Sequence, residues 1–579
     1  MTGDRYLIVV PHGGTTGSWR ERLTTIGRQH CLALTEGRSF LLLAPESALL
    51  FGRPGHLDSA VLGPIYARGG RTALTDLPDD DAGAAPGARA ASLIQRYWGD
   101  YVAIIGDERG PTILRAPFGD LSCYLHRSSD ATMLASDVAL LESVSVEPAI
   151  DWHAVALQLI APDIRRRRTC LANIEELACG ERITLGPSPE YETMWSPWQF
   201  LGHEQQCDDR SAATERLRKV LLDTVAAQTS DGMPNLVLLS GGIDSSAVAA
   251  ALSAAGREAA ALTMVTRDAA GDERAFARAV AGHCRFPLAE MVRDPAMVDL
   301  TRSEACDLPY PTETSFSQAT RAAIRAHTGS SGHRILHGGG GDQIFCSMQS
   351  AAPLADLIRA KGFDRRIPAL TLDLARLANA TAGAVARQAL ARVISRRSAY
   401  RWPSNLECLT PMVCAQESEA VSHAWLSPPA GAGSGSAGHV ALTLSALGIV
   451  QSPTRSTGAP WKAILLSQPV IETCLSIPPW LWFERGRNRA IARRAIEDLL
   501  PHGHVWRPGK GAMASFMIEI FDANRSRLRA MIGDGLLVRE GLVDREVCLK
   551  VLDARGPIKG NAWARLLQFA DVEAWAASW

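Results

Sequence analysis

One short motif constrains the fold of this chain more than any other feature. It spans Ser240–Ser246, with the letters SGGIDSS, between an apolar run at Leu236–Leu239 and a helical pattern over Ser245–Ala255. Its two glycines lack Cβ atoms, so backbone N–H groups can approach an anion, and its serines add hydroxyl donors at a helix N-terminus. The motif predicts a phosphate-binding loop between a strand and a helix; the alternative is a glycine-rich turn that caps a helix.

Strands and helices alternate around this motif. Such alternation predicts a parallel sheet with helices on both faces, and from about Ala351 onward the helical pattern dominates. The segment Pro428–Gly438, rich in Pro, Ala, Gly and Ser, is expected to be a flexible surface loop. Further strands are expected at Ala261–Val265 and Arg334–His337, and a further helix at Glu273–His283.

The first 200 or so residues follow a different pattern, in which short apolar runs such as Tyr6–Val10 and Tyr101–Ile105 alternate with turn residues. This pattern is typical of a β-rich domain. A chain of 579 residues is too long for one ordinary domain. We therefore expect two domains, at residues 1–205 and 206–579.

Composition disfavours some classes of partner. A net charge of −1 supplies no overall field that would attract nucleic acid or an anionic membrane. No apolar segment approaches the length needed to cross a bilayer, and the N-terminus lacks the apolar core of a signal peptide. The 12 cysteines are scattered, without metal-binding spacing, so we expect reduced thiols in a cytoplasmic protein.

A second glycine-rich segment follows the strand at Arg334–His337. Four glycines, Gly338–Gly341, precede Asp342, and they would bring the backbone against a nucleotide. Asp244 makes a poor phosphate contact unless a cation intervenes, so we expect Asp244 and Asp342 to share Mg²⁺. For the glycine run taken alone, a flexible loop is the alternative.

The two segments together resemble a known superfamily. No Gly-Lys-Ser/Thr follows the first loop, so it is not a Walker loop; it resembles the pyrophosphate-binding loop of ATP pyrophosphatases, which cleave ATP to AMP and pyrophosphate. Asp272 and Glu273 at a helix start, and Ile335–Phe345, are similar to segments of the asparagine synthetase domain. This resemblance implies ATP-dependent amide formation through carboxylate adenylation. It also implies ATP and pyrophosphate ligands at Leu239, Ser240, Gly241, Gly242, Asp244, Ser245, Ser246, Met264, Val265, His337, Gly338 and Gly339.

Two further residues are candidates for catalysis. Val505–Gly511 resembles the family's lysine loop, in which Lys510 would stabilise charge during adenylation and acyl transfer; a solvated surface lysine is the alternative. Glu472 is the candidate general base for the attacking amine. A structural salt bridge from Glu472 to Arg489 or Arg493 is an equally weighted alternative.

The N-terminal domain carries its own resemblance. Trp98–Val102, Arg115–Gly119 and Ala135–Asp137 resemble landmarks of class II glutamine amidotransferase domains, which implies a β-rich sandwich. Those domains use a cysteine directly after the initiator methionine as nucleophile, and this chain has Thr2 there. We expect no glutaminase activity, so the amine nucleophile should come with the substrate.

Segments near the C-terminus resemble one particular group of enzymes related to asparagine synthetases. Ser467–Pro478 and Gly486–Ala495 are similar to segments of lasso peptide cyclases, as is the glycine run followed by Gln343 in place of the usual glutamate. This implies macrolactam formation between an Asp or Glu side chain and the N-terminal amine of a precursor core peptide, with ATP and Mg²⁺. It also implies two partners, a leader-peptide-binding protein and a leader peptidase. The alternatives are an amide ligase using free ammonia on a small carboxylate, an inactive peptide-binding scaffold, and a nucleic-acid-modifying pyrophosphatase.

Two arginine-rich stretches stand apart from these motifs. Arg165–Arg168 suggests a patch for peptide or nucleic acid, although a solvated loop is the commoner outcome for such a run. The arginines between Arg485 and Arg494 have helical spacing and could face pyrophosphate or an acidic peptide.

Overall fold

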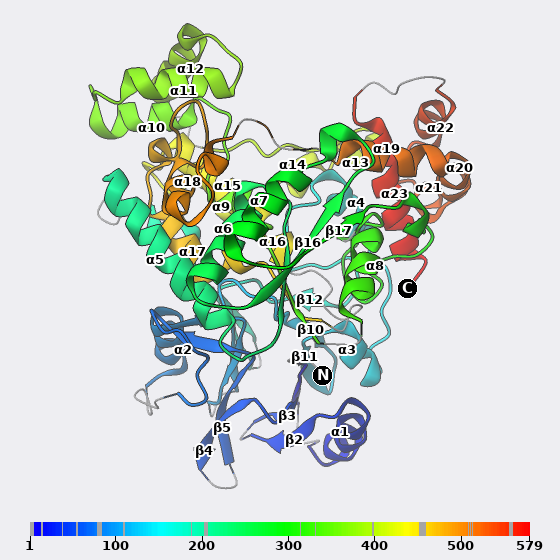
Figure 1. Cartoon of the computed structure of the whole chain (residues 1–579). Helices are drawn as coiled ribbons and strands as arrows, with labels where there is room; N and C mark the ends of the chain where they lie inside the picture. The colour runs from blue at the N-terminus through cyan, green and yellow to red at the C-terminus, as the bar shows by residue number, and fades with distance from the viewer. Residues whose placement is uncertain are drawn as a thin grey trace.

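The computed structural model of the chain (Figure 1) has an antiparallel N-terminal part and a parallel, helix-rich C-terminal part. The boundary predicted between residues 205 and 206 falls within 202–206, outside the described residues. The structure describes residues 5–12, 16–37, 39–53, 56–77, 84–107, 110–186, 188–201, 207–312, 314–329, 332–395, 399–450, 459–507, 509, 511, 513–554 and 560–579.

Two six-stranded antiparallel sheets form the N-terminal part, which confirms the predicted β-rich sandwich. Their strand orders are β12-β10-β11-β1-β3-β2 and β14-β13-β9-β8-β5-β4. The central strand β1 pairs Leu7 with both Ala135 and Leu43. The strands are β1 (Leu7–Pro11), β2 (Ala33–Glu36), β3 (Leu41–Ala44), β4 (Leu49–Arg53), β5 (His56–Leu62), β8 (Val102–Ile105), β9 (Thr112–Arg115), β10 (Tyr124–Arg127), β11 (Ala131–Ala135), β12 (Glu175–Glu176), β13 (Glu181–Thr184) and β14 (Glu190–Thr193), with a separate pair β6 (Ile65–Ala67) and β7 (Tyr97–Gly99).

Successive side chains along these strands point to opposite faces of the sheet, and both faces are buried, which explains the continuous apolar runs. Ile8 and Leu42 point into a cluster between the two sheets, whereas Leu7 and Leu43 point to the opposite face and join the main core. A strand buried on both faces needs apolar residues at every position. The N-terminal helices are α1 (Thr16–His30), α2 (Pro86–Arg96), α3 (Val138–Ser143) and α4 (Trp152–Ile160), with a 3₁₀ turn η1 at Pro197–Phe200.

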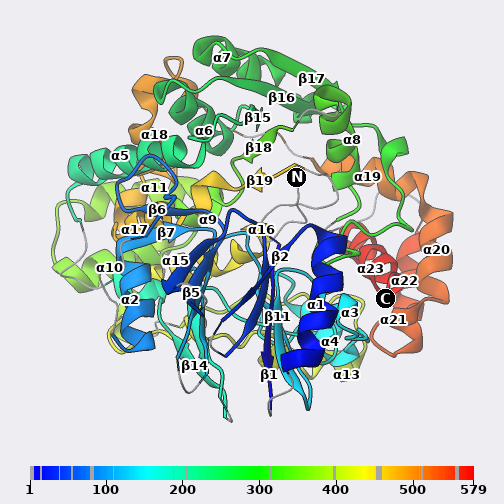
Figure 2. The ribbon, with the colours of Figure 1, turned by 90° about the horizontal axis from the view of Figure 1, so that it is seen from below.

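The C-terminal part is built on a five-stranded parallel sheet in the order β17-β16-β15-β18-β19, as predicted. Leu236 clusters with residues of helix α8 on one face of the sheet, whereas Val237 lies on the other face, where α6 packs against β15 and α7 against β16 and β17. Figure 2 shows these strands together with α6 and α7 outside them. The elements are β15 (Asn235–Leu238), α6 (Ile243–Ala254), β16 (Ala259–Val265), α7 (Arg274–Cys284), β17 (Leu288–Val292), α8 (Ser317–Thr328), β18 (Arg334–His337) and β19 (Trp461–Lys462).

Helices complete the C-terminal part, and the first of them, α5 (Arg210–Gln228), begins where the Asp209 carboxylate accepts a hydrogen bond from Ala212 N at 2.7 Å. The others are α9 (Gly341–Ile344), α10 (Ala352–Lys361), α11 (Ile367–Leu377), α12 (Ala382–Ser395), α13 (Pro411–Cys414), α14 (Glu417–Ala420), α15 (Ser434–Ser445), α16 (Leu447–Val450), α17 (Gln468–Leu475), α18 (Ala490–Ala495), α19 (Ala514–Ala523), α20 (Arg525–Gly533), α21 (Leu536–Arg539), α22 (Arg545–Asp553) and α23 (Ala562–Ala576).

The prediction of a flexible loop over Pro428–Gly438 is wrong in its second half, where α15 begins. Its small residues allow close packing against α10: a Cβ on Gly435 would lie 3.1 Å from Pro353 Cα. Asp356 accepts a hydrogen bond from Ser436 N at 2.8 Å and so holds the first turn of the helix. The small residues that suggested a flexible loop therefore allow α15 to pack closely against α10.

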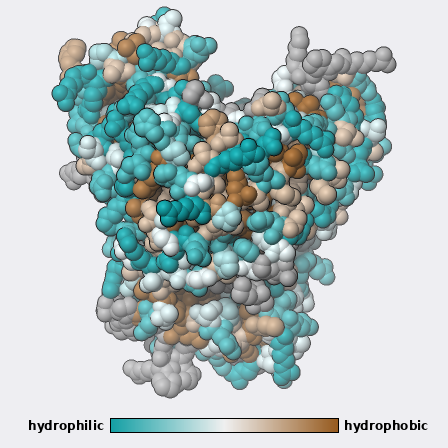
Figure 3. All heavy atoms as spheres, viewed as in Figure 1, coloured by the Kyte–Doolittle hydropathy of each residue, from teal (hydrophilic) through white to brown (hydrophobic). Residues whose placement is uncertain are grey.

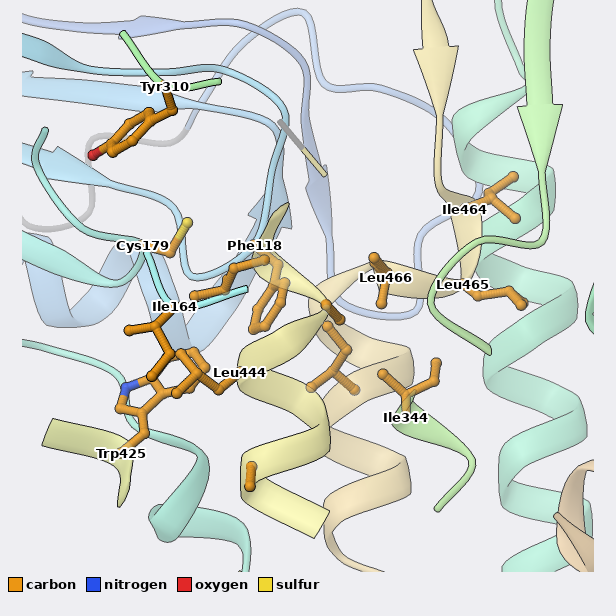
Figure 4. Close-up of a cluster of buried hydrophobic side chains, with 14 of the residues drawn as sticks. Phe118, Ile164, Cys179, Tyr310, Ile344, Trp425, Leu444, Ile464, Leu465 and Leu466 are labelled. Atoms are coloured by element: carbon orange, nitrogen blue, oxygen red, sulfur yellow. The ribbon is translucent and has the colours of Figure 1, made fainter. Parts of the chain in front are cut away.

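The two parts of the chain share one hydrophobic core (Figure 4). Phe118 and Ile164 from the N-terminal part lie in the same buried cluster as Leu444 and Leu465 from the C-terminal part. The surface in Figure 3 is mostly hydrophilic, with a notch between the lobe of α10–α12 and the lobe of α19–α22. Within the described part of the chain, every helix is too short or too polar to span a bilayer.

Candidate active site

The predicted nucleotide loops meet where the strand order of the parallel sheet reverses. β15 is followed by β16 on one side, while β18 lies on its other side, so the loops after β15 and β18 flank a topological switch point. A Cβ on Gly338 would lie 2.4 Å from Ser245 N, and a Cβ on Gly341 would lie 2.5 Å from Asp244 Cγ. These two glycines are required because any side chain would push the two loops apart.

The first loop is organised by its own serines. Ser240 N donates to Ser245 Oγ at 3.2 Å, and Gly242 N donates to Ser240 Oγ at 3.3 Å. Gly241 has φ of +74°, and a Cβ there would lie 2.7 Å from Phe276 Cβ. The loop thus runs tightly into the N-terminus of α6, whose partial positive charge favours an anion.

The two predicted metal ligands, Asp244 and Asp342, lie close together, and the guanidinium group of Arg489 lies between them. Arg489 Nη1 lies 2.9 Å from Asp244 Oδ2 and 2.6 Å from Asp342 Oδ1. Two carboxylates that share one guanidinium nitrogen are close enough to share a divalent ion, so the residues fit Mg²⁺. Mg²⁺ is commonly held by one or two carboxylates together with substrate phosphates. Across the described residues, no group of three or more His, Cys, Asp or Glu side chains has the arrangement of an all-protein metal site.

Arg489 is a site residue whose partners differ from those that the sequence suggested. It belongs to the arginine-rich stretch, and its backbone φ of +59° at the start of α18 is unusual for a residue other than glycine. This conformation holds its guanidinium, with a side chain only 11% exposed, between the two loops. The predicted partners of this stretch were phosphates or an acidic peptide; in the structure, Arg489 is bound to the carboxylates of the site itself.

The lysine loop is fastened to the phosphate loop by its flanking residues. Arg507 Nη2 donates to Gly241 O at 3.1 Å and to the Glu273 carboxylate, and its guanidinium lies 3.7 Å from the centre of the Phe276 ring. A Cβ on Gly511 would lie 2.8 Å from Glu273 Cγ. Lys510 itself is outside the described residues. Before it, Arg507 contacts the first nucleotide loop, and directly after it, Gly511 lies against Glu273 at the start of α7.

The remaining predicted ligands lie at the carboxyl ends of the same strands. Leu239 N donates to Leu262 O at 2.9 Å, and Met264 and Val265 end β16. His337 ends β18, and its Nδ1 accepts a hydrogen bond from Gly339 N at 3.1 Å. Burial lowers the pKa of His337 to about 4, so this imidazole is neutral near pH 7. Ser246 Oγ lies 3.2 Å from His504 Nε2, which connects α6 to the residue directly before the lysine loop.

Glu472 lies on α17 at the contact between the two parts of the chain. Its carboxylate accepts hydrogen bonds from Arg68 Nη1 at 2.5 Å, Trp195 Nε1 at 3.0 Å and Gln468 Nε2 at 2.8 Å. This geometry favours the structural alternative over a general base. The partner expected in that alternative, Arg489 or Arg493, was wrong: Glu472 pairs with Arg68 of the N-terminal part.

Residues of the amidotransferase-like segments also take part in the contact between the two parts of the chain. Lys462, at the end of β19, lies 2.6 Å from Asp100 Oδ2 and 2.7 Å from Asp120 Oδ2. Asp100 belongs to the Trp98–Val102 segment noted in the sequence. Thr2, which stands in the nucleophile position, is outside the described residues.

Comparison with known proteins identifies the C-terminal part. The asparagine synthase family matches residues 216–432 and 461–577, more than half of the chain, and the match includes both nucleotide loops, Arg489 and the lysine loop. No curated protein matches the chain significantly.

Two solved structures show a slight likeness. One is glutamine phosphoribosylpyrophosphate amidotransferase from B. subtilis, complexed with ADP and GMP, at 12% identity and a TM-score of 0.19 over 59% of this chain and 72% of that one. The other is an allosteric regulatory enzyme of purine biosynthesis, at 11% identity and a TM-score of 0.19 over 52% of this chain and 76% of that one. At these TM-scores neither likeness bears on fold or function. The family match, together with the two glycine loops and their paired carboxylates, shows that this chain belongs to the asparagine synthase family of ATP-dependent amide ligases.

Proposed function

We propose that the chain closes a macrolactam ring in a precursor peptide, as lasso peptide cyclases do. An oxygen of an Asp or Glu side-chain carboxylate attacks the α-phosphorus of ATP, which forms an acyl-adenylate and releases pyrophosphate. The peptide's N-terminal amine then attacks the acyl carbon and loses a proton, and AMP leaves as the amide bond forms. The peptide must be held so that amine and acyl carbon meet, which makes preorganisation a large part of catalysis.

The observation that supports adenylation is the pairing of Asp244 with Asp342 at the junction of two glycine loops. Mg²⁺ bound by these carboxylates would neutralise phosphate charge. The loop of Ser240–Ser246 offers hydroxyl and backbone donors for pyrophosphate, and we propose that Lys510 supports the charge that develops on the α-phosphate. Each of these groups acts on ATP, so they fit any member of an adenylating amide ligase family.

Two features support a peptide amine as nucleophile. Position 2 holds Thr2 where glutaminase domains of this type have cysteine, so glutamine is not expected to supply ammonia. The segments Ser467–Pro478 and Gly486–Ala495 resemble those of cyclases. The same resemblance implies that the enzyme works with a leader-peptide-binding protein and a leader peptidase, and the scattered cysteines favour a cytoplasmic protein.

The family match favours one competing function, an amide ligase that uses free ammonia on a small carboxylate such as aspartate. The two functions differ in the molecule that triggers pyrophosphate release. They also differ in the product, because ring closure leaves a peptide lighter by one water, whereas ammonia gives a free primary amide.

The test is pyrophosphate release from Mg-ATP by the full chain, with and without the two partner proteins. A lasso-type core peptide is compared with aspartate plus ammonia, and products are identified by mass spectrometry. Asp244→Asn serves as the inactive variant and Asp498→Asn, an exposed aspartate paired with Arg218, as its matched control. Peptide-dependent release with loss of one water supports the proposal. Release with aspartate and ammonia moves the function to a small-molecule ligase, and no release under any condition favours a scaffold.

A further inference from the structure

A cavity of about 120 Å³ lies between the two parts of the chain, outside the nucleotide loops. From the N-terminal part it is lined by Arg115 at the end of β9, by Arg165 and Arg166 after α4, and by residues of β12 to β14. From the C-terminal part it is lined by His423 and Trp425, around the 3₁₀ turn η4 (Ala424–Leu426), and by Leu447 of α16. Its size suits a small organic acid or several waters.

Positive charge exceeds negative charge around this cavity. Three lining guanidinium groups, those of Arg115, Arg165 and Arg166, face two lining carboxylates, Glu176 and Glu181. Glu176 is paired with Arg115 at 2.7 Å. Glu181 is already bound to a fourth arginine, Arg167, through contacts of 3.1 Å to both of its oxygens. Glu176 also lies 3.8 Å from Arg165 Nε, so the three lining arginines and two lining glutamates leave an excess of one positive charge.

Two buried N–H donors on residues that line the cavity have no partner among the described residues. Arg115 is 1% exposed; its Nη1 bonds Glu176 and Leu177 O, but its Nη2 makes no hydrogen bond. Arg166 donates through Nη1 and Nη2 to the backbone oxygens of Ile164 and Ala420, and its Nε is buried without an acceptor. A buried donor without an acceptor costs about 1–3 kcal/mol, so two on residues that line one cavity point to an acceptor that the described residues do not supply.

A histidine supplies a third donor. His423 Nδ1 accepts a hydrogen bond from Trp425 N at 3.1 Å, which places the ring proton on Nε2. Burial and the neighbouring Arg166 lower the pKa of His423 to about 4, so the ring is neutral near pH 7. The cavity thus combines guanidinium and imidazole N–H groups with the apolar Trp425 and Leu447.

We propose that this interdomain cavity is a binding site for a carboxylate group. Guanidinium groups match the planar geometry of a carboxylate and bind it through parallel N–H bonds. The carboxylate comes either from a free small acid or from the C-terminus of a peptide. The site takes no part in the chemistry on ATP, so it does not depend on the proposed function.

One short helix, α16, lies between the cavity and the second glycine loop. Leu447 of α16 lines the cavity, while Ile449 of the same helix contacts the second glycine loop: a Cβ on Gly339 would lie 3.0 Å from Ile449 Cγ2. A ligand in the cavity therefore packs against the helix that supports Gly339. We expect an occupied site to change the affinity of the chain for ATP, and ATP to change the affinity for the acid by the same factor.

The test is calorimetric titration of the full chain, without ATP, with succinate, its neutral analogue succinamide and inorganic phosphate. A second arm uses a capped tripeptide with a free C-terminal carboxylate and the same tripeptide as its amide. Arg166→Met and Thr193→Trp, which places bulk at the cavity, are compared with Arg168→Met. Arg168 is an exposed arginine of the same run that pairs with Asp151 outside the cavity. Circular dichroism checks that each variant is folded.

We expect succinate or the acidic tripeptide to bind, and the neutral forms to bind at least about tenfold more weakly. Arg166→Met and Thr193→Trp should each weaken binding about tenfold or more, while Arg168→Met should leave it unchanged. The arm that binds more tightly identifies the source of the carboxylate. Absence of carboxylate binding to the wild type, tighter binding of phosphate, or equal binding by all three variants would overturn the proposal.

Discussion

Replacing Lys462 by methionine tests whether the two parts of the chain are held together by a buried ion cluster. Lys462 Nζ lies 2.6 Å from Asp100 Oδ2 and 2.7 Å from Asp120 Oδ2, so these oxygens are at most about 5.3 Å apart. Without the lysine their repulsion is about 3 kcal/mol at an effective dielectric constant of 20. Breaking a buried pair by removing one partner costs about 3–5 kcal/mol in total. We therefore expect Lys462→Met to lower the free energy of unfolding by about 3–5 kcal/mol.

The pH dependence of this effect follows from the lysine. Burial lowers the pKa of Lys462, but Asp100 and Asp120 outweigh burial and raise it above the ordinary lysine value. A raised folded-state pKa means that the stabilisation is complete below the unfolded-state pKa of about 10.4 and is lost as pH rises through the folded-state value. The difference between wild type and variant should therefore be constant from about pH 6 to about pH 9.

Urea titrations followed by tryptophan fluorescence measure this difference. Lys219→Met is the matched control: Lys219 is 69% exposed and pairs with Asp223, so its loss should cost no more than about 1 kcal/mol. Adding Asp100→Asn and Asp120→Asn to Lys462→Met removes the repulsion and should restore most of the stability. If Lys462→Met costs no more than the control, the argument for a buried ion cluster at this contact fails.

Four further variants test the site. Asp342→Asn should reduce Mg²⁺-dependent pyrophosphate release by about a hundredfold or more, because the ion loses one of two carboxylates; unchanged release at saturating Mg²⁺ would remove Asp342 from the metal site. Lys510→Met should lower kcat by about 10²–10³ with folding unchanged, and full activity would make it a surface lysine. Gly338→Ala should weaken ATP binding, measured by calorimetry, because its Cβ would lie 2.4 Å from Ser245 N; wild-type affinity would contradict the required loop contact. Glu472→Gln should lower the melting temperature while kcat and its pH profile stay within a fewfold of wild type, whereas a large drop in kcat with loss of the acidic limb of that profile would restore the general base.

The amino-acid sequence by itself determined the elements that depend on local pattern. The strand, glycine loop and helix around Ser240–Ser246 are specified by adjacent residues, because a loop that binds phosphate needs both glycines and the helix start in one stretch. The parallel sheet followed from the alternation of strands and helices. Even the convergence of Asp244 and Asp342 was predictable, because the carboxyl ends of neighbouring parallel strands meet at one edge of a sheet.

The tertiary structure decided which distant side chains pair. Glu472 could be matched with the nearby arginines at 489 and 493 by sequence proximity, but its partner Arg68 is 404 residues away. From the sequence, Arg489 could have been a phosphate ligand, but in the folded chain it lies between two carboxylates. A run such as Arg165–Arg168 has the composition of a solvated loop, yet Arg165 is buried and stacks on Tyr310 at 3.9 Å.

The prediction from composition was also wrong for the start of helix α15, because that helix depends on a tertiary contact. Gly435 and Ser436 are poor helix formers in isolation, and only the approach of α10, with Asp356 capping the turn, makes a helix favourable there. Local patterns specify backbone hydrogen bonding and the spacing of apolar faces. Ion pairs, buried donors and close helix contacts depend on which surfaces meet after the chain has folded, and no local pattern carries that information.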